Sequence, residues 1–476
     1  MGHDKKDMRL ATREEVYSID KAAAKVYGLS SSLLIEKAGT ALAQAFETIL
    51  QQQGWSVKSK IGIWCGPGNN GVDGRVMAHL LREKSLSVEV LQGSAWDPVD
   101  FDIIVDALFG VGLNRPVTGE LKEKILALNQ TRKTVIAVDI PSGLDANSGS
   151  VLGACVKARW TLTVAPAKPG LFLQEGPAHC GRIVSIDIGF PRELLRSRAR
   201  STFLIGAASA RKLLPPRTLT ANKTTFGNLL VIAGSEGMEG AALLSAEAAA
   251  RMGCGYVSLC SPSESVFKKA RPDFLNLSLK SFFQSDLKKY KAVLVGPGLG
   301  VNKQTEKVLE HLLKHHSQVL VDADALTVLA QKRAKDLPET WVLTPHAGEL
   351  SRLTGTPAKE LEADRLAGAQ KAQKSLKCLV LLKGFRTVLA TQAKSYIIGS
   401  GNVALAKAGS GDVLSGFISS LMAQGLASDQ AAALGAYLHG KIADDWLRRG
   451  HSNRTLMASD LPELIDASLT SLKKGG

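Results

Sequence analysis

Residues 61–74 of this chain read Ile61-Gly62-Ile63-Trp64-Cys65-Gly66-Pro67-Gly68-Asn69-Asn70-Gly71-Val72-Asp73-Gly74. The apolar run at the start is typical of a buried β-strand, and the glycines that follow allow backbone N–H groups to close around an anion. Ligands of an open α/β sheet bind beyond the carboxyl ends of its strands. The stretch therefore predicts an α/β fold with a phosphate-binding site at the end of this strand.

A second glycine-rich loop lies far down the chain, at Ala408-Gly409-Ser410-Gly411-Asp412. It precedes an apolar helix and places a carboxylate beside the N–H groups of the helix N-terminus, where an anion is stabilised. The carboxylate of Asp412 is suited to take a proton from a hydroxyl that attacks a phosphoryl group. We therefore expect one chain to hold two sites for phosphorylated ligands.

The length of the chain predicts more than one domain, because its 476 residues exceed what a single hydrophobic core usually supports. Short apolar runs alternate with stretches long enough for crossover helices, which is typical of doubly wound sheets. The runs cover 60–65, 87–91, 102–105, 134–138, 161–165 and 183–188, and then 228–233, 255–259, 292–296, 318–321, 341–344 and 377–382. The pattern fades at 191–222, so we predict α/β domains at 1–205 and 206–476.

The composition favours a soluble enzyme of the cytoplasm. Hydrophobic residues make up 45% and charged residues 22% of the chain, and no apolar leader follows Met1. The six cysteines are scattered without C-x-x-C spacing, so they are expected to be buried thiols rather than zinc ligands or disulfides. The net charge of +15 is dispersed, which indicates a solvated basic surface rather than a nucleic-acid interface.

An N-terminal helix is predicted to begin after Thr12. Thr12 and Glu15 have the spacing of a capping box. Val16, Ile19, Ala23 and Val26 then recur on one helical face, which we expect to pack against the first domain.

Three further segments of the first domain follow strands and carry side chains capable of chemistry. They read Asp-Ala-Leu-Phe-Gly-Val-Gly-Leu at 106–113, Asp-Ile-Pro-Ser-Gly-Leu-Asp at 139–145 and Lys-Pro-Gly at 168–170. Each aspartate alone would be explained equally well as a helix cap. Because parallel strands deliver their carboxyl ends to one edge of a sheet, we expect all three segments to converge.

Together with the loop at 66–74, these segments resemble the N-terminal domain of the bifunctional NAD(P)H-hydrate repair enzymes. The resemblance implies a Rossmann-like, three-layer doubly wound domain that interconverts the R and S forms of hydrated NADH or NADPH at C6. It implies dinucleotide binding by Asn69, Asn70, Gly71, Val72 and Asp73 and by Gly110, Val111, Gly112, Leu113, Asn114, Arg115 and Pro116. It further implies a potassium ion at Asn70, Asp106 and Ser142, whose oxygens suit a hard cation.

Asp139 is the candidate acid/base residue of this domain, because inversion at a carbon that carries a hydroxyl group and a hydrogen requires proton transfer near the ring. The resemblance also places Asp139 in contact with the substrate. Val72 departs from the family pattern, which usually has glycine there. If this position required a positive φ, a β-branched residue would strain the loop by ~1 kcal/mol or more.

Segments of the second domain also follow strands: Gly296-Pro297-Gly298-Leu299-Gly300, Thr344-Pro345-His346-Ala347-Gly348-Glu349-Leu350 and Lys383-Gly384-Phe385-Arg386-Thr387. With the loop at 408–412 they resemble the ADP-dependent NAD(P)H-hydrate dehydratase domain, a ribokinase-like α/β fold. The resemblance implies that ADP, with Mg²⁺, binds at Lys383, Gly384, Phe385, Arg386, Thr387, Asn402, Lys407, Ala408, Gly409, Ser410 and Gly411. It implies that Ala241, Gly300, His346 and the catalytic Asp412 face the hydrated nicotinamide.

Phosphorylation of the ring hydroxyl would turn a poor leaving group into a good one, and loss of phosphate would restore the dihydropyridine. Two departures from the family pattern are the segment 221–227 and the absence of a glycine in 402–405. His346 could instead be a packed, hydrogen-bonded residue. The segment Asp322-Ala323-Asp324-Ala325-Leu326 also resembles a signature of the family, although helix capping would explain its aspartates equally well.

The sequence leaves two other readings open: a ribokinase-like small-molecule kinase, and a first domain that holds a dinucleotide or a protein partner without turnover. The partners we expect are small molecules, namely hydrated NADH, hydrated NADPH and ADP. We expect no nucleic-acid or membrane partner, and we expect a homo-oligomer.

Overall fold

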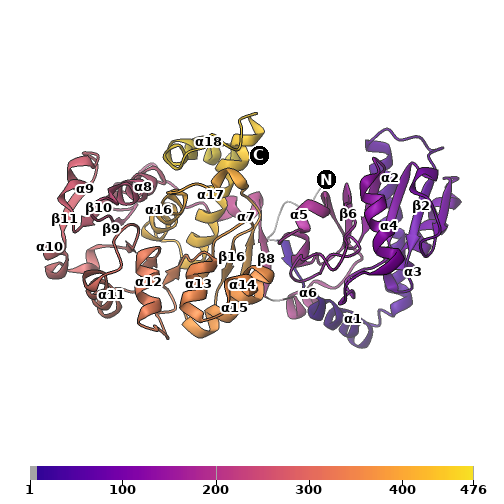
Figure 1. Cartoon of the computed structure of the whole chain (residues 1–476), viewed down its shortest axis with the longest axis horizontal. Coiled ribbons are helices and arrows are strands. Elements are labelled where there is room, and N and C mark those ends of the chain that lie inside the picture. Colours follow the sequence, from indigo (N-terminus) through magenta and orange to yellow (C-terminus); the bar gives the residue numbers. More distant parts are fainter. Residues whose placement is uncertain (1–7, 200, 475–476) are drawn as a thin grey trace. The chain divides into compact units, whose positions relative to one another are not determined.

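The computed structural model describes residues 8–199 and 201–474, which form two compact units (Figure 1). Residues 9–202 make up the N-terminal unit, and residues 203–474 belong with Met8 to the C-terminal unit. Strand β8 (Thr202–Ile205) is hydrogen-bonded into the larger, C-terminal sheet. The division therefore falls a few residues before the boundary predicted at Ile205.

The N-terminal unit is a six-stranded sheet covered by helices. Its elements are α1 (Arg13–Tyr27), α2 (Ser31–Gln52), β2 (Ile61–Cys65), α3 (Asn69–Glu83), β3 (Val88–Leu91), β4 (Ile103–Ala107), α4 (Gly119–Gln130), β5 (Thr134–Val138), β6 (Trp160–Val164), α5 (Gly176–His179), β7 (Arg182–Ile186) and α6 (Arg192–Arg198), preceded by β1 (Met8–Leu10). The strand order is β3-β2-β4-β5-β6-β7, and every pair is parallel. All six strands coincide with apolar runs predicted from the sequence.

Helices cover both faces of this sheet because successive strand residues point to opposite sides. Ile103 and Val105 of β4 belong to a core cluster with residues of α2 and α3. Ile104 belongs to a second cluster with Ile125 and Leu128 of α4. The three-layer, doubly wound domain predicted from the sequence is therefore present.

The strand order places a topological switch point between β2 and β4. The chain runs from β2 outward to β3 and then returns to β4 on the other side of β2. The loops that follow β2 and β4 therefore diverge at the carboxyl edge and leave a crevice, where ligands of doubly wound sheets bind.

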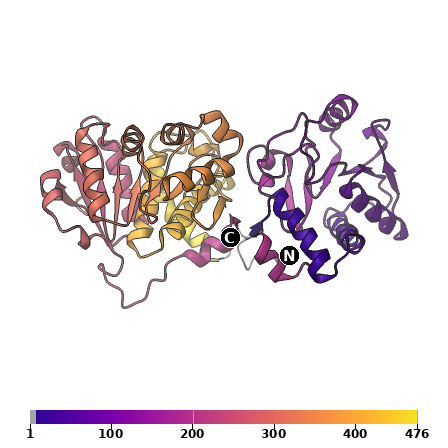
Figure 2. The ribbon, with the colours of Figure 1, turned by 90° about the horizontal axis from the view of Figure 1, so that it is seen from below.

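The C-terminal unit is built around the larger sheet. Its helices and strands are β8, α7 (Ala207–Leu213), β9 (Asn228–Ile232), α8 (Glu239–Arg251), β10 (Tyr256–Ser261), α9 (Glu264–Lys269), β11 (Leu275–Ser278), α10 (Leu279–Gln284), β12 (Ala292–Val295), α11 (Lys303–His315), β13 (Val319–Val321), α12 (Asp324–Gln331), β14 (Val342–Leu343), α13 (Ala347–Thr354), α14 (Ala358–Ala363), α15 (Arg365–Leu376), β15 (Leu379–Leu382), β16 (Val388–Ala390), β17 (Ser395–Ile398), α16 (Ser410–Ala423), α17 (Ser428–Arg448) and α18 (Leu461–Lys474). Figure 1 shows α8, α16 and α17 on one face of the sheet and α11, α12 and α13 on the other. The same sheets and their helices are seen from below in Figure 2.

This sheet has the order β1-β8-β17-β16-β15-β14-β13-β12-β9-β10-β11. The pairs from β15 to β11 are parallel, whereas β16 pairs antiparallel with both β15 and β17. Its switch point lies between β9 and β12, so the loops after these two strands open a second crevice. The sequence patterns missed β1, β8, β11, β16 and β17, which are strands of three or four residues.

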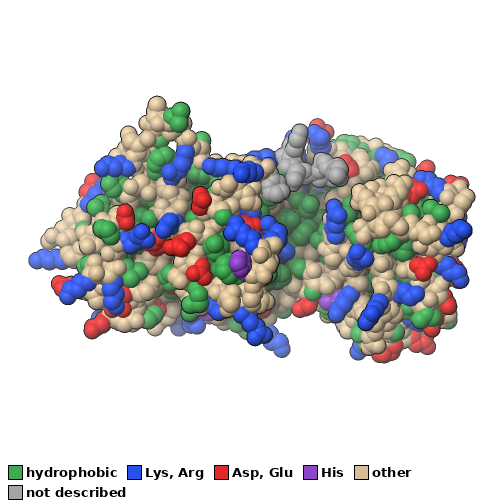
Figure 3. Space-filling view, turned by 90° about the horizontal axis from the view of Figure 1, so that it is seen from above, with side chains coloured by type: hydrophobic (Ala, Val, Ile, Leu, Met, Phe, Trp, Pro, Cys, Tyr) green, Lys and Arg blue, Asp and Glu red, His purple; other side chains and the backbone are tan. Residues whose placement is uncertain are grey.

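Other sequence predictions can be compared with the structure. The capping box of Thr12 and Glu15 is present at the start of α1. Ile19 and Ala23 are buried, but Val26, predicted on the same packed face, is 67% exposed because it lies in the last turn of the helix. The cysteines are free thiols, and only Cys254 is less than fully buried. On the face drawn in Figure 3, Lys and Arg side chains are spread widely rather than gathered in one patch.

Candidate functional sites

A cavity of about 660 Å³ opens at the switch point of the N-terminal sheet. Its walls come from the start of α3, the loop after β4, helix α1, and the segments that follow β5 and β6. The predicted site residues that line it are Asn69, Asn70, Asp73, Gly110, Val111, Gly112, Leu113, Asn114, Arg115 and Asp139. Gly71, Val72 and Pro116 were predicted to bind the dinucleotide but are not part of this lining.

The glycine loop after β2 leads directly into α3. Gly68 is the N-cap, and the N–H of Val72 donates to the Gly68 carbonyl at 3.1 Å, so Val72 lies in the first helical turn. Positive φ is not required there, and the predicted strain at Val72 is wrong. The requirement for glycine falls instead on Gly71, where a Cβ atom would lie 1.9 Å from the Gly66 carbonyl oxygen.

A buried ion pair faces this cavity. The Nζ of Lys168 donates to Oδ1 of Asp139 and, at 2.8 Å, to the Val164 carbonyl. The Val164 N–H also donates to Oδ1 of Asp139, and Asp139 has a φ of +65°. Sequence reasoning assigned no role to Lys168, although it noted Lys168-Pro169-Gly170 as one of the segments that follow strands. The carboxylate predicted as acid/base is thus held in place by a lysine.

Two more carboxyl groups approach this pair. Burial, reinforced by the charges of Asp139 and Asp20, raises the pKa of Asp73 to about 7. Burial also raises the pKa of Asp20, which α1 contributes to the cavity wall. Asp73 is therefore a group that can donate or accept a proton near neutral pH. Its Oδ1 atom is buried and has no protein hydrogen-bond partner.

Of the three residues predicted to hold potassium, Asp106 and Ser142 are hydrogen-bonded to each other, and Asn70 lines the cavity. Ser142 donates from Oγ to Oδ1 of Asp106 at 2.6 Å and from its N–H to Oδ2 at 2.8 Å. Burial raises the pKa of Asp106 to about 6. Asn70 donates from Nδ2 to the Val138 carbonyl at 3.3 Å, while its buried Oδ1 has no protein hydrogen-bond partner. The orphaned amide oxygen of Asn70, the Asp106 carboxylate and the Ser142 hydroxyl are ligand types that suit a hard cation.

The second site lies at the N-terminus of α16. Gly409 caps the helix with a φ of +83°, a conformation that favours glycine, and Ser410 begins the helix. Beneath this loop the Nζ of Lys383 donates to Oδ1 of Asp322 at 2.7 Å, and Ser415 donates to Oδ2 at 2.6 Å. Asp322 was predicted either as part of a family signature or as a helix cap. In the structure it forms an ion pair with Lys383, a residue predicted to bind the nucleotide.

Electrostatics distinguishes the groups around this loop. Burial raises the pKa of Asp412 to about 7, and the neighbouring charge of Asp322 acts in the same direction. Burial acts to lower the pKa of Lys383, but Asp322 and Glu349 outweigh it, so the net shift is upward. Lys383 therefore remains a cation, while Asp412 exchanges a proton near neutral pH.

Ser410 has a partner that sequence reasoning missed. Its Oγ lies 3.1 Å from Nε2 of His439, and burial lowers the pKa of this histidine to about 4, so the ring is neutral. His439 is in the middle of the apolar helix α17. Its spacing carried no signal of a site, since an interior histidine on an apolar face most often serves packing.

The residues predicted to face the nicotinamide come from both sides of the second switch point. Ala241 lies at the start of α8 and would touch a Cβ atom placed on Gly298. The N–H of Gly300 donates to Oδ2 of Asp324 at 2.8 Å, so Asp324 holds this loop. Ala241 and the Gly296–Gly300 loop therefore lie side by side.

His346 has a structural role and an accessible ring. Its Nδ1 accepts hydrogen bonds from the N–H groups of Gly348, at 3.0 Å, and Glu349, so it caps α13. In the neutral ring the proton then lies on Nε2. The side chain is 55% exposed, and the neighbouring Pro345 carbonyl accepts from the Lys383 N–H. Capping engages Nδ1, and Nε2 lies 3.6 Å from Oε1 of Glu349 on a ring that is about half exposed.

The remaining predicted nucleotide residues form two segments beside α17. Asn402 donates from Nδ2 to Oδ1 of Asp444 at 2.9 Å, and the Gly401 N–H donates to Oδ2 at 3.0 Å. Arg386 has a buried Nε without a protein hydrogen-bond partner, and Phe385 is 50% exposed. Asp444, which sequence reasoning missed, thus anchors the loop that contains Asn402. Within the described residues, three or more His, Cys, Asp or Glu side chains do not gather as a metal site.

Comparison with protein families supports a two-part chain. A family model described as NAD(P)H-hydrate dehydratase matches residues 229–466. A model described as YjeF-related protein N-terminus matches residues 31–99 and 92–170. None of the helices among the described residues has the length and apolar character needed to cross a membrane.

Individual relatives match along nearly the whole chain. The bifunctional NAD(P)H-hydrate repair enzyme Nnr of Moorella thermoacetica is 33% identical, over 98% of this chain and 98% of the relative. The enzyme of the same name from Coxiella burnetii is 34% identical, over 91% of this chain and 94% of the relative. The crystal structure of ADP/ATP-dependent NAD(P)H-hydrate dehydratase from Bacillus subtilis, co-crystallized with ATP/Mg²⁺, is 31% identical with a TM-score of 0.51. It covers 56% of this chain and 97% of its own.

Proposed function

The chain belongs to the family of bifunctional NAD(P)H-hydrate repair enzymes, and we propose which residues of its two sites perform the two reactions. It is a bifunctional enzyme: an epimerase for the R and S hydrates of NADH and NADPH, and a dehydratase that returns the S hydrate to NADH or NADPH. We assign the epimerase to the N-terminal unit and the ADP-dependent dehydratase to the C-terminal unit.

The observation that carries the epimerase assignment is the buried Asp139–Lys168 pair beside a cavity large enough for a nicotinamide nucleotide. Lys168 holds the Asp139 carboxylate in place, so that Asp139 would take up a proton at the ring. Asp73, with its pKa near 7, lies at the same cavity and is suited to return a proton. The loops at 69–73 and 110–116 are proposed to bind the dinucleotide.

Potassium fits the chemistry of three oxygen-bearing residues of this unit. Asn70 Oδ1, the Asp106 carboxylate and Ser142 Oγ would hold it, and the orphaned Asn70 oxygen supports this ligand set. A bound cation there would supply positive charge at the phosphate-binding loop. Removal of K⁺ is expected to lower the affinity for the hydrate.

The dehydratase assignment rests on Asp412 at the N-terminus of α16. Asp412 would take the proton from the C6 hydroxyl as its oxygen attacks the terminal phosphoryl group of ADP, which releases AMP. Departure of phosphate from C6 with its bonding electrons, followed by loss of a ring proton, restores the dihydropyridine. Lys383 and the helix N-terminus stabilise the transferring phosphoryl group. Mg²⁺ that enters with the nucleotide would neutralise phosphate charge.

We propose that Lys383, Gly384, Phe385, Arg386 and Thr387 and the segment from Asn402 to Gly411 bind the adenine nucleotide. Ala241, Gly300 and His346 are proposed to face the nicotinamide, with His346 Nε2 as a hydrogen-bond donor. The cytoplasmic location, the homo-oligomeric state and the absence of nucleic-acid or membrane partners stay predictions from the sequence.

The test uses purified full-length protein with separated R and S hydrates, with and without ADP and Mg²⁺. The dihydronicotinamide absorbance should return only with nucleotide, and the R hydrate should convert to S without nucleotide. AMP and inorganic phosphate should appear in equal amounts with the restored cofactor. A stable phosphate ester in the mass spectrum, without restored cofactor, would instead identify a kinase, and unchanged epimer ratios would identify a first domain without turnover.

A further inference from the structure

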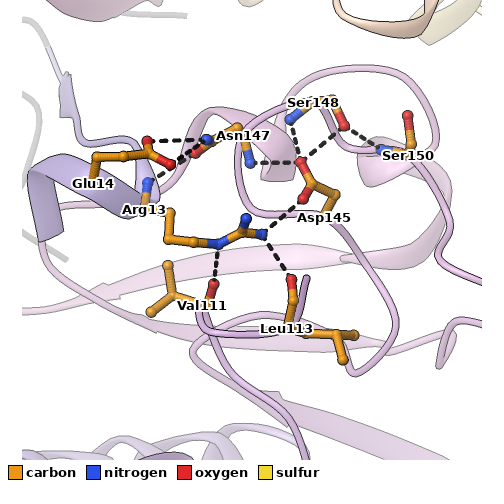
Figure 4. A network of polar contacts seen from close by, with 8 residues as sticks. All are labelled: Arg13, Glu14, Val111, Leu113, Asp145, Asn147, Ser148 and Ser150. Carbon is orange, nitrogen blue, oxygen red and sulfur yellow. Dashed lines mark hydrogen bonds and ion pairs between the residues drawn. The ribbon is translucent and has the colours of Figure 1, made fainter. Parts of the chain in front are cut away.

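The first residue of α1, Arg13, reaches across the N-terminal unit to the loop that follows β4 (Figure 4). Its Nε donates to the Val111 carbonyl at 2.7 Å, and its Nη2 donates to the Leu113 carbonyl at 2.7 Å. The side chain is 16% exposed. One guanidinium thus binds two carbonyls of the segment predicted to hold the dinucleotide.

A carboxylate fixes Arg13 from the other side. Nη2 also donates to Oδ2 of Asp145 at 2.8 Å, while Oδ1 of Asp145 accepts from the Ser148 N–H and hydroxyl and from the Asn147 N–H. Burial acts to raise the pKa of Asp145, but the hydrogen bonds from Ser148 and Arg13 outweigh it, so the pKa is lowered. The Arg13 N–H donates to Oδ1 of Asn147 at 2.8 Å. Both the backbone and the side chain of Arg13 are therefore anchored.

The direction of the two carbonyls has a consequence for the neighbouring N–H groups. In a trans peptide the C=O and N–H bonds point to opposite sides. When the carbonyls of Val111 and Leu113 point to Arg13, the N–H groups of Gly112 and Asn114 point away from it. Gly112 and Asn114 both line the cavity. Backbone N–H groups in a glycine-containing loop are suited to an anionic ligand.

We propose that Arg13 is a positioning residue for the epimerase site: it orients the loop 110–116 so that the N–H groups of Gly112 and Asn114 bind the pyrophosphate of the hydrated dinucleotide. This inference rests on the proposed function of the N-terminal unit. Helix α1 precedes residues 31–170, to which the family model for this unit matches. The same helix also supplies Tyr17 and Asp20 to the cavity wall, so Arg13 joins two walls of one site.

The experiment compares full-length Arg13→Gln and Arg13→Lys with wild type, and Lys21→Gln serves as the matched control. Lys21 is an exposed cation of the same helix. Epimerase KM and kcat are measured with R hydrate of NADPH, and the dehydration of S hydrate by the same preparations reports on the other unit. Amide hydrogen exchange of residues 110–116 is measured without ligand.

Arg13→Gln is expected to raise the epimerase KM at least about tenfold, the scale of lost hydrogen bonds to a charged group, with kcat within about threefold. Exchange should accelerate in 110–116 and not across the whole unit. Arg13→Lys retains the positive charge opposite Asp145 but not the guanidinium that donates to two carbonyls. Its epimerase KM should therefore lie between those of wild type and Arg13→Gln. The epimerase KM and kcat of Lys21→Gln should match those of wild type. The dehydration rates of all three variants should also match wild type.

An unchanged KM in the folded Arg13→Lys and Arg13→Gln proteins would overturn the proposal. A fall in kcat at constant KM, with exchange accelerated throughout the unit, would also overturn it, because that pattern indicates a general loss of folded enzyme. Wild-type protein that fails to interconvert the epimers would overturn the proposed function itself, and this arm distinguishes the two failures.

Discussion

At the scale of single residues, the two sites share one arrangement. Each has a buried aspartate paired with a lysine, Asp139 with Lys168 and Asp322 with Lys383. Each also has a second aspartate, Asp73 or Asp412, whose pKa burial raises to about 7. The ion pair supplies fixed charges, and the second carboxyl group can exchange a proton near neutral pH.

Replacement of Asp412 by asparagine is expected to reduce ADP-dependent dehydration roughly 100-fold or more, because the base for the ring hydroxyl is lost. Wild-type activity should fall as the pH drops below about 7, where Asp412 becomes protonated. Initial rates with S hydrate measure both effects. Asp466→Asn, an exposed carboxylate of the same unit, is the control, and near-normal dehydration by Asp412→Asn would exclude Asp412 as the base.

Replacement of Asp139 by asparagine should stop R-to-S conversion while the dehydratase still consumes S hydrate. Supplied with a mixture of epimers and ADP, the variant should leave the R hydrate behind, as chromatography would show. Asp100→Asn, on an exposed turn of the same unit, controls for general effects. If the variant equilibrates the epimers well above the spontaneous rate, Asp139 binds substrate and another group moves the proton.

Asp73 should make the stability of the N-terminal unit depend on pH. The pKa of Asp73 is about 7 in the folded chain against 3.8 for an unperturbed aspartate, so the folded state retains a proton that the unfolded chain releases. The favourable contribution of Asp73 to the free energy of unfolding is complete below about pH 4, declines as the pH rises, and is lost above about pH 7. The melting temperature of this unit should thus fall more steeply between these values in wild type than in Asp73→Asn. Parallel curves would contradict the raised pKa.

At the scale of elements, the start of α3 decides what the glycine loop tolerates. Val72 has helical geometry and lies outside the cavity lining, so its replacement by glycine relieves no strain. Val72→Gly should lower the unfolding free energy by about 0.5–1 kcal/mol through the greater freedom of the unfolded chain, with unchanged epimerase kinetics. Val72→Ala is the matched variant, since alanine favours the helix. A gain in turnover or affinity on Val72→Gly would contradict this geometry.

At the scale of the whole molecule, the two units have separate hydrophobic cores. Phe46 of α2 is fully buried in one, and Phe417 of α16 is fully buried in the other. Two thermal transitions are therefore expected in calorimetry. Phe46→Ala and Phe417→Ala should each lower the stability of one unit, by about 3–5 kcal/mol, and so assign the transitions.

ADP with Mg²⁺ should raise only the transition assigned by Phe417→Ala. Binding to the folded state stabilises that unit by about 2.7 kcal/mol at a ligand concentration 100 times Kd. The Asp139→Asn protein should show the same shift, which controls for effects through the first site. Equal shifts of both transitions would contradict the assignment of the nucleotide to the C-terminal unit.

The sequence by itself determined the two α/β units, the parallel strands and the loops that converge on each site. Apolar runs such as those of β2 and β4 are buried on both faces, so their hydrophobicity marks them without any knowledge of the fold. The glycine loops could be predicted equally well, because backbone conformation and close approach restrict them to a few residue types. The sequence did not predict the short strands β16 and β17 or the exposure of Val26, because local pattern is weak in short elements and at helix ends.

Only the tertiary structure decided which side chains act together. Lys168 with Asp139, Asp322 with Lys383, and Arg13 with the carbonyls of the loop after β4 are contacts between segments far apart in the chain. It also decided the backbone at Val72, because φ depends on where α3 begins and not on residue type. Burial, which raises the pKa of Asp73 and Asp412, is set by every element packed around them, and no local stretch of sequence contains that information.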